Sequence, residues 1–170
     1  QAAVQIALLL GARVIATAGS EEKLAHARAL GAHETINHTT DDIADAVRRL
    51  TNRRGVEIVV EHVGQATWEK SLRCLARGGR LVCLGVATLS TGGGRAWLHA
   101  AGQIVRFPWF WTIRLMNDNR AVAGVNLGKL WDVEGLLRPQ LDTLLEHARA
   151  GRIRPRVDRT YRMTRGLVEE

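Results

Sequence analysis

Short apolar runs alternate with amphipathic helical patterns along this chain. Mostly apolar runs, several rich in β-branched residues, predict strands over residues 13–18, 56–64, 80–85 and 121–128, and a short extended piece is expected at 33–37. Apolar residues at helical spacing predict helices near the start and over 21–30, 39–51, 66–76 and 132–150, the last with Pro139 as a kink. This alternation predicts an α/β fold, a Rossmann-type doubly wound parallel sheet with helices on both faces.

Two regions depart from this rhythm. The chain opens with "QAAVQIALLLGA", which lacks an initiator methionine and already has a helical pattern, so we expect it to begin within a helix. Residues 87–119 hold three consecutive glycines, three of the five tryptophans and both phenylalanines. The aromatic stretch 97–111 fits a core or subunit interface first, a substrate mouth second and a membrane surface third, because aromatics and arginine are enriched at interfaces.

Composition narrows the classes of partner. The chain of 170 residues is about one domain long, and its 46% hydrophobic content can bury a core. The net charge of +7 is spread over helix faces and turns without a basic block flanked by stacking aromatics. This distribution favours an anionic small molecule over nucleic acid.

Cysteine spacing and hydropathy give no sign of a metal centre, secretion or a membrane span. Cys74 and Cys83 lack C-x-x-C spacing, and no histidine pairs with Cys or carboxylates at ligand spacing, so we expect no metal and no disulfide. There is no signal-peptide pattern and no apolar run of about 18 residues. We therefore expect a cytoplasmic protein.

The first strand-to-helix turn carries the main candidate site. A dinucleotide fold that selects NAD usually places Asp or Glu at the end of its second strand, to bind the ribose 2′-hydroxyl. Here Gly19 stands at that position, Ser20 offers a hydroxyl at a helix N-terminus, and Lys23 adds a positive charge one turn later. These parts predict a pocket for the 2′-phosphate of NADPH. In the alternative, Ser20 is only a helix cap and Lys23 a solvated side chain, and inward-turned Glu21 or Glu22 would count against the pocket.

Glycines at other strand ends extend the pattern. Gly64, Gly85 and Gly128 are also the last residues of predicted strands, where a missing side chain lets a ligand approach the backbone. Any one of them alone is explained by a turn, but four in the same topological position favour a ligand site.

Several motifs in order resemble the nucleotide-binding domain of the medium-chain dehydrogenase/reductase superfamily. The resemblance is greatest to its zinc-free quinone oxidoreductase branch, including VAT-like members. The motifs are "VQIALLLGARVIATAGSEEKLAHARALGA", "EHVG", "SLRCLARGGRLVCLG" and "LMNDNRAVAGVNLG".

The resemblance implies positions for the cofactor NADPH. It places Gly19, Ser20 and Lys23 at the 2′-phosphate and Val63 and Gly64 on the adenosine side. Gly85, Val86, Val125 and Asn126 correspond to positions near the nicotinamide. His38 stands where the family often has tyrosine, so it either stacks on adenine or meets the phosphate, or is a surface histidine.

The same resemblance sets the expected domain limits. Residues 1–157 correspond to the nucleotide-binding domain, and residues 158–170 to the start of the return toward a catalytic domain. The family's glycine-rich turn, which follows its first strand, should lie immediately before Gln1, so we expect a sheet with a gap where that strand is central.

The implied activity is hydride transfer from NADPH to a quinone or an activated carbon–carbon double bond, in an enzyme that forms homodimers through this domain. No catalytic acid or base is assigned, since Tyr161, Cys83 and His62 form no readable nucleophile–base arrangement. Two alternatives stay open: a non-catalytic remnant with a structural or partner-binding role, and the cofactor domain of a zinc alcohol dehydrogenase. We expect the chain alone to be inactive.

Overall fold

The computed structural model describes residues 1–84, 112–131, 133, 135–157 and 160. Gly85, Val86, Tyr161 and the aromatic stretch 97–111 lie outside these described residues, so the predictions made for them are not addressed by the structure.

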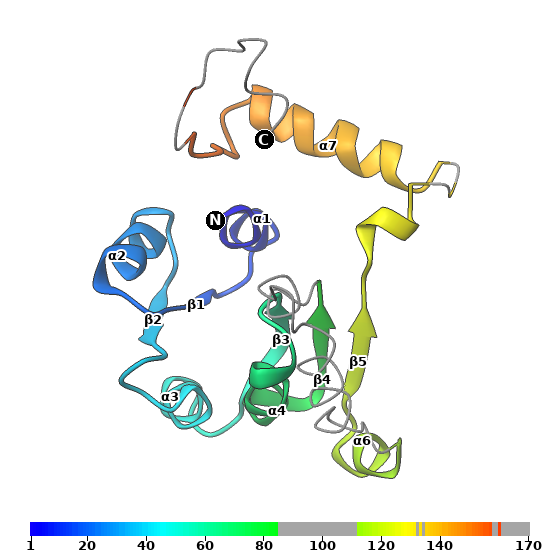
Figure 1. Ribbon diagram of the computed structural model, residues 1–170. Helices are drawn as coiled ribbons and strands as arrows, with labels where there is room; N and C mark the ends of the chain where they lie inside the picture. Colours follow the sequence, from blue (N-terminus) through cyan, green and yellow to red (C-terminus); the bar gives the residue numbers. More distant parts are fainter. Residues whose placement is uncertain (85–111, 132, 134, 158–159, 161–170) are drawn as a thin grey trace, which may run out of the picture.

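In the described residues, five strands form two parallel sheets (Figure 1). The strands β1 (Ile15–Ala18) and β2 (Glu34–Asn37) form the first sheet. The second has the order β3-β4-β5, with β3 at Val56–Glu61, β4 at Leu75–Cys83 and β5 at Ala121–Gly124. Within the described part of the chain, β1 pairs only with β2 and β3 only with β4. The break between β1 and β3 is where the sequence predicts a gap.

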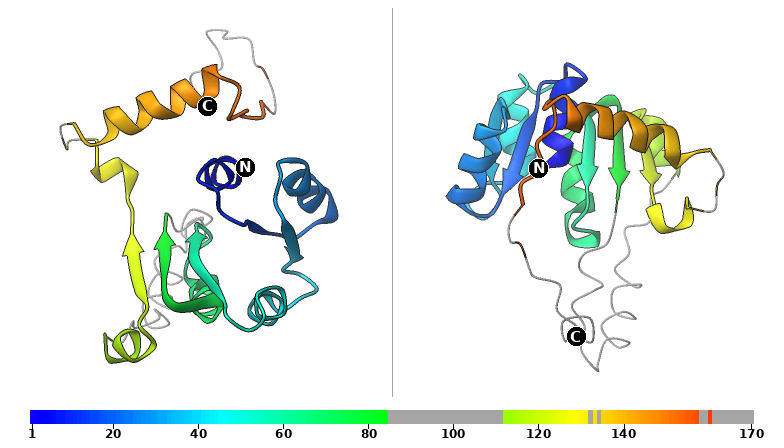
Figure 2. Two further views of the ribbon diagram at one scale, coloured as in Figure 1. Left: turned by 180° about the vertical axis from the view of Figure 1, so that it is seen from behind. Right: turned by 90° about the horizontal axis from the view of Figure 1, so that it is seen from above.

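Helices flank both faces of the sheets, which confirms the Rossmann-type α/β fold class (Figure 1, Figure 2). Helices α1, α2 and α7 lie on one side, and α3, α4 and α6 on the other. Their bounds are α1 Ala2–Leu9, α2 Glu21–Ala29, α3 Ile43–Leu50, α4 Gln65–Cys74, α6 Thr112–Asp118 and α7 Leu137–Arg149, with a 3-10 turn η2 at Leu127–Lys129. Among the described residues, no helix combines the length and apolar character needed to cross a bilayer.

Two hydrophobic clusters hold the sheets and helices together. Ile36 of β2 packs with Val47 of α3 and Cys74 of α4, and Val59 of β3 borders this cluster. Leu81 of β4 is fully buried in a second cluster with Leu72 and Leu75. Val59 borders both clusters, so the separate sheets share a continuous apolar interior.

The predicted boundary between the fourth helix and the next strand is wrong. The prediction carried the helix through residue 76 and began the strand at Arg80, but α4 ends at Cys74 and β4 starts at Leu75. Leu75 already has extended backbone angles. A side chain at Gly55 would lie 2.7 Å from the Ala76 nitrogen, and this close backbone approach lets β4 begin early beside β3.

The kink predicted at Pro139 is also wrong. Helix α7 begins at Leu137, so Pro139 lies in its first turn, where a backbone N–H would have no partner within the helix. Helix α6 was not predicted, because the aromatic and glycine-rich composition before it obscured the helical pattern.

Candidate functional site

The turn after β1 has the geometry of a capped helix start. Ser20 is the N-cap of α2, with extended backbone angles, and its hydroxyl accepts a hydrogen bond from the Lys23 N–H at 3.4 Å. The capping interpretation of Ser20 is therefore correct, and the cap uses the Lys23 N–H. A helix N-terminus with free N–H groups favours an anion.

The charged side chains around this turn leave Lys23 available. Glu21 is held in an ion pair with Arg28, two turns along α2, and Arg28 also donates to the Thr35 hydroxyl at 2.8 Å. Within the described residues, the Lys23 ammonium group has no carboxylate partner. Glu22 is exposed at the surface of the same turn. The positive charge of Lys23 is thus not neutralised by Glu21.

His38 lies directly beside Gly19. A side chain built at Gly19 would place its Cβ 2.9 Å from His38 Cε1 and 3.2 Å from Nε2. The His38 backbone N–H donates to the Ala18 carbonyl at 3.1 Å, which extends the β1–β2 pairing to this point. The structure therefore brings together Gly19, Ser20, Lys23 and His38 at the carboxyl ends of β1 and β2.

Asn37 is a residue of this site that sequence reasoning missed. Its side-chain oxygen accepts from the Thr39 N–H at 3.0 Å and from the Thr39 hydroxyl at 2.6 Å. This closes the turn that carries His38. The sequence signal was available, since Asn followed by His-Thr-Thr after a strand is typical of a turn held by an Asn side chain.

The second part of the predicted site is the turn after β3. Gly64 has φ of 116°, which favours glycine, and its carbonyl accepts from both the backbone N–H and the hydroxyl of Thr67. Val63 is 40% exposed, so its side chain is open to a ligand. Gly64 is the N-cap of α4 and makes no side-chain cap.

The third part follows β5. The Val125 N–H donates to the Cys83 carbonyl at 2.9 Å, which continues the β4–β5 pairing by one residue. Asn126 then caps η2, and its carbonyl accepts from the Lys129 N–H at 3.0 Å. In this parallel sheet, the ends of β3 and β5 lie at the same edge as Cys83, so Val63, Gly64, Val125 and Asn126 share that edge.

Among the described residues, the two cysteine thiols are both weaker acids than a free cysteine. Burial raises the pKa of the Cys74 thiol to about 11. The pKa of Cys83 is also raised, first by burial and then by the negative charge of Glu61. In the parts of the chain that the structure describes, no three His, Cys, Asp or Glu side chains gather to hold a metal ion.

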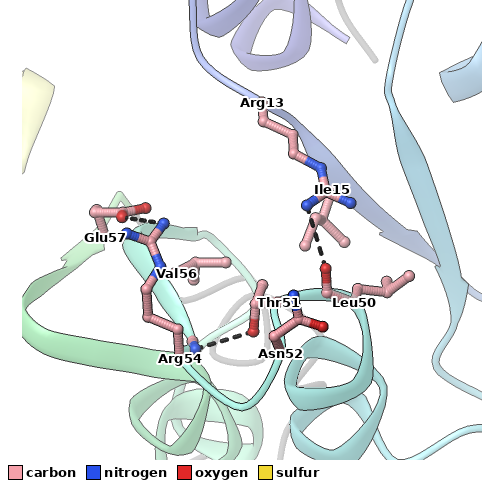
Figure 3. Close-up of a pocket in the computed structure, with 9 residues that line it drawn as sticks. Arg13, Ile15, Leu50, Thr51, Asn52, Arg54, Val56 and Glu57 are labelled. Atoms are coloured by element: carbon pink, nitrogen blue, oxygen red, sulfur yellow. Dashed lines mark hydrogen bonds and ion pairs between the residues drawn. The ribbon is translucent and has the colours of Figure 1, made fainter.

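A pocket of about 260 Å³ lies at the opposite ends of the strands, between the start of β1 and the start of β3 (Figure 3). Its two arginines already have partners: Arg13 donates to the Leu50 carbonyl at 3.2 Å and pairs with Glu34, and Arg54 pairs with Glu57. None of the predicted cofactor residues lines it. We therefore place the candidate site at the carboxyl ends of the strands and not in this pocket.

Comparisons with known proteins agree on one family. A family model described as zinc-binding dehydrogenase matches residues 1–138. The 2-haloacrylate reductase of Burkholderia sp is 46% identical over 79 residues, which are 46% of this chain and 24% of that protein.

Two solved structures have a fold similar to that of this chain. The quinone oxidoreductase of Pseudomonas syringae has a TM-score of 0.73 and 32% identity over 90% of this chain and 42% of its own. The Escherichia coli quinone oxidoreductase, solved in complex with NADPH, has a TM-score of 0.72 and 27% identity over 92% of this chain and 43% of its own. The chain thus spans less than half the length of these proteins.

Proposed function

This chain belongs to the zinc-binding dehydrogenase family, in the quinone oxidoreductase-like branch of the medium-chain dehydrogenase/reductase superfamily, and we propose that it is an NADPH-binding domain. The enzyme that contains it would transfer hydride to a quinone or an activated carbon–carbon double bond. The E. coli relative solved with NADPH and the reductase from Burkholderia support this class of cofactor and reaction.

One observation supports NADPH over NADH. Gly19, directly after β1, has no side chain, and the nearby Lys23 has no carboxylate partner among the described residues. Position 19 has no acidic side chain to meet a ribose 2′-hydroxyl, and the adjacent imidazole of His38 fills the space that such a side chain would need. Ser20 caps the start of α2 through the Lys23 N–H, and among the described residues the Lys23 ammonium pairs with no carboxylate. An anionic 2′-phosphate at this position would gain both the helix N-terminus and the cation.

The chain's own residues then have distinct tasks in this proposal. Lys23, Ser20 and His38 hold the phosphorylated ribose, and the Val63–Gly64 turn lies against the adenosine side. Val125 and Asn126, at the end of β5, orient the nicotinamide together with Gly85 and Val86. Bound NADPH supplies the hydride, and the protein supplies position and a dry pocket.

The remaining proposals concern the whole enzyme. We propose a cytoplasmic homodimer joined through this domain, acting on a small molecule. Because the chain spans less than half of its relatives, we propose that it does not catalyse the reaction alone.

The test is a calorimetric titration of NADPH and NADH into the purified protein. Lys23→Ala should weaken NADPH binding by about tenfold or more while NADH binding changes little, because a charge-assisted contact to phosphate is lost. Lys70→Ala, which removes an exposed lysine of α4, is the matched control and should leave both affinities unchanged. Equal binding of both nucleotides to wild type and Lys23→Ala would refute the phosphate site. Binding of neither nucleotide would favour the partner-binding alternative.

A further inference from the structure

A buried carboxylate at the end of β3 has no assigned role. Glu61 is only 6% exposed, and its side chain makes no ion pair among the described residues. Burying a carboxylate without a cation costs free energy unless hydrogen bonds replace its hydration. Such a group is retained where its hydrogen bonds fix a geometry that an apolar side chain could not fix.

Three oxygens of Glu61, two in its carboxylate and one in its backbone carbonyl, accept hydrogen bonds from three different segments. One carboxylate oxygen accepts from the Val63 N–H at 2.7 Å, and the other accepts from the Ser71 hydroxyl at 2.8 Å. Ser71 lies in the second turn of α4 and is itself buried. The Glu61 carbonyl also accepts from the Leu84 N–H at 2.7 Å, so the same residue reaches past the end of β4.

Two sets of contacts hold this turn at different points. The Gly64 carbonyl accepts from the N–H and the hydroxyl of Thr67, whereas the Val63 N–H donates to the Glu61 carboxylate. Gly64 itself has φ of 116°, and Val63 is 40% exposed. Hence the carboxylate, held at one end by α4, sets the direction of the Val63 N–H. It therefore sets the path of the backbone through Val63 and Gly64.

We propose that Glu61 is a positioning residue for the cofactor. This proposal rests on the proposed function, the binding of a nicotinamide nucleotide. Its carboxylate holds the Val63–Gly64 turn in the conformation that receives the adenosine side of the nucleotide, without touching the nucleotide. The adenosine side is common to NADPH and NADH, whereas Lys23 acts only on the 2′-phosphate. Glu61 therefore governs affinity for both nucleotides, and Lys23 governs the choice between them.

The experiment combines amide hydrogen exchange at Val63 with titration of NADPH and NADH. Glu61→Ala should raise the exchange rate of the Val63 amide and weaken both nucleotides by about tenfold, leaving their affinity ratio unchanged. Glu61→Gln keeps an oxygen for the Val63 N–H and an amide for Ser71, so it should bind both nucleotides within about twofold of wild type.

Gln5→Ala is the matched control for loss of stability. Gln5 is 8% exposed and makes two hydrogen bonds to the backbone of Arg154, away from the β3–α4 turn. Gln5→Ala should lower the melting temperature without changing the exchange rate of the Val63 amide or the affinity for NADPH or NADH.

Each outcome bears on a different claim. An unchanged Val63 exchange rate in Glu61→Ala, an unchanged affinity, or an equal affinity loss in Gln5→Ala overturns the positioning role. A shift in the NADPH-to-NADH ratio in Glu61→Ala also overturns it, because the residue would then act on the phosphate. If wild type binds neither nucleotide, the proposed function fails first, whatever the Val63 exchange shows, and the cofactor role falls with it.

Discussion

In the proposed NADPH site, Gly19 is the residue whose substitution should change cofactor choice most directly. Gly19→Asp should abolish the preference for NADPH, because a carboxylate would repel the 2′-phosphate and meet the 2′-hydroxyl of NADH instead. The single variant has a second problem, since its Cβ would lie 2.9 Å from the His38 ring. We therefore expect Gly19→Asp alone to bind both nucleotides weakly.

A second substitution, which removes the His38 imidazole, separates the charge effect of Asp at position 19 from its steric clash. Gly19→Asp combined with His38→Ala should recover NADH binding and prefer NADH by about tenfold, as measured by titration. His38→Ala alone removes one group of the proposed phosphate site, so it should weaken NADPH binding but keep the preference for NADPH, because Lys23 is still present. A double variant that still prefers NADPH would show that position 19 does not face the ribose.

At the scale of elements, helix α3 depends on the charge of its cap. The Asp42 side chain accepts from the Asp45 N–H at 3.0 Å, and this hydrogen bond, reinforced by one from Ala44, holds the pKa of Asp42 below its ordinary value of 3.8. A lowered pKa means that the folded state favours the ionised form. The stabilising contribution is therefore fully present above pH 3.8 and is lost as the pH falls through the lower, folded value.

This linkage predicts a pH-dependent difference between two cap variants. Asp42→Ala should lower the melting temperature at pH 7, because the cap is lost at every pH, and the gap to wild type should narrow in strong acid. Asp42→Asn keeps an acceptor for the Asp45 N–H, so its melting temperature should respond less to pH in the same range. Thermal melts of the three proteins between pH 2 and pH 7 measure both effects. Parallel curves for all three would contradict the assigned role of the charge.

Elements of this fold were predictable where the local pattern and the tertiary environment agree. The β1–α2 turn follows from Gly19 and Ser20 alone, since a glycine and a hydroxyl before two acidic residues specify a strand end and a helix cap. The α4–β4 boundary did not follow, because it depends on the approach of Gly55 to Ala76, which are far apart in sequence. Likewise, Glu61 looks like an ordinary polar residue at a strand end until its contact with Ser71 is seen.

At the scale of the whole molecule, the main feature is that the described strands form two separate sheets. Strands β1 and β3 border the same apolar cluster, yet in the described chain each has a hydrogen-bonding neighbour on one side only. Ile58 and Val60 of β3 are 55% and 45% exposed, although a doubly wound sheet normally covers such residues. By contrast, β4 pairs on both sides, with β3 and with β5.

This arrangement makes a prediction about local stability. Amides on the unpaired sides of β1 and β3 should exchange with solvent at least about tenfold faster than those in the middle of β4. The reason is that no ladder hydrogen bond protects these amides. Residue-resolved hydrogen exchange measures this, and the amides of β4 near Leu81 provide the internal reference. Equal protection along β1, β3 and β4 would show that a further strand pairs with both edges in solution. In that case the stability of the molecule would depend on that strand, and variants that weaken β1 or β3 should be tested with it present.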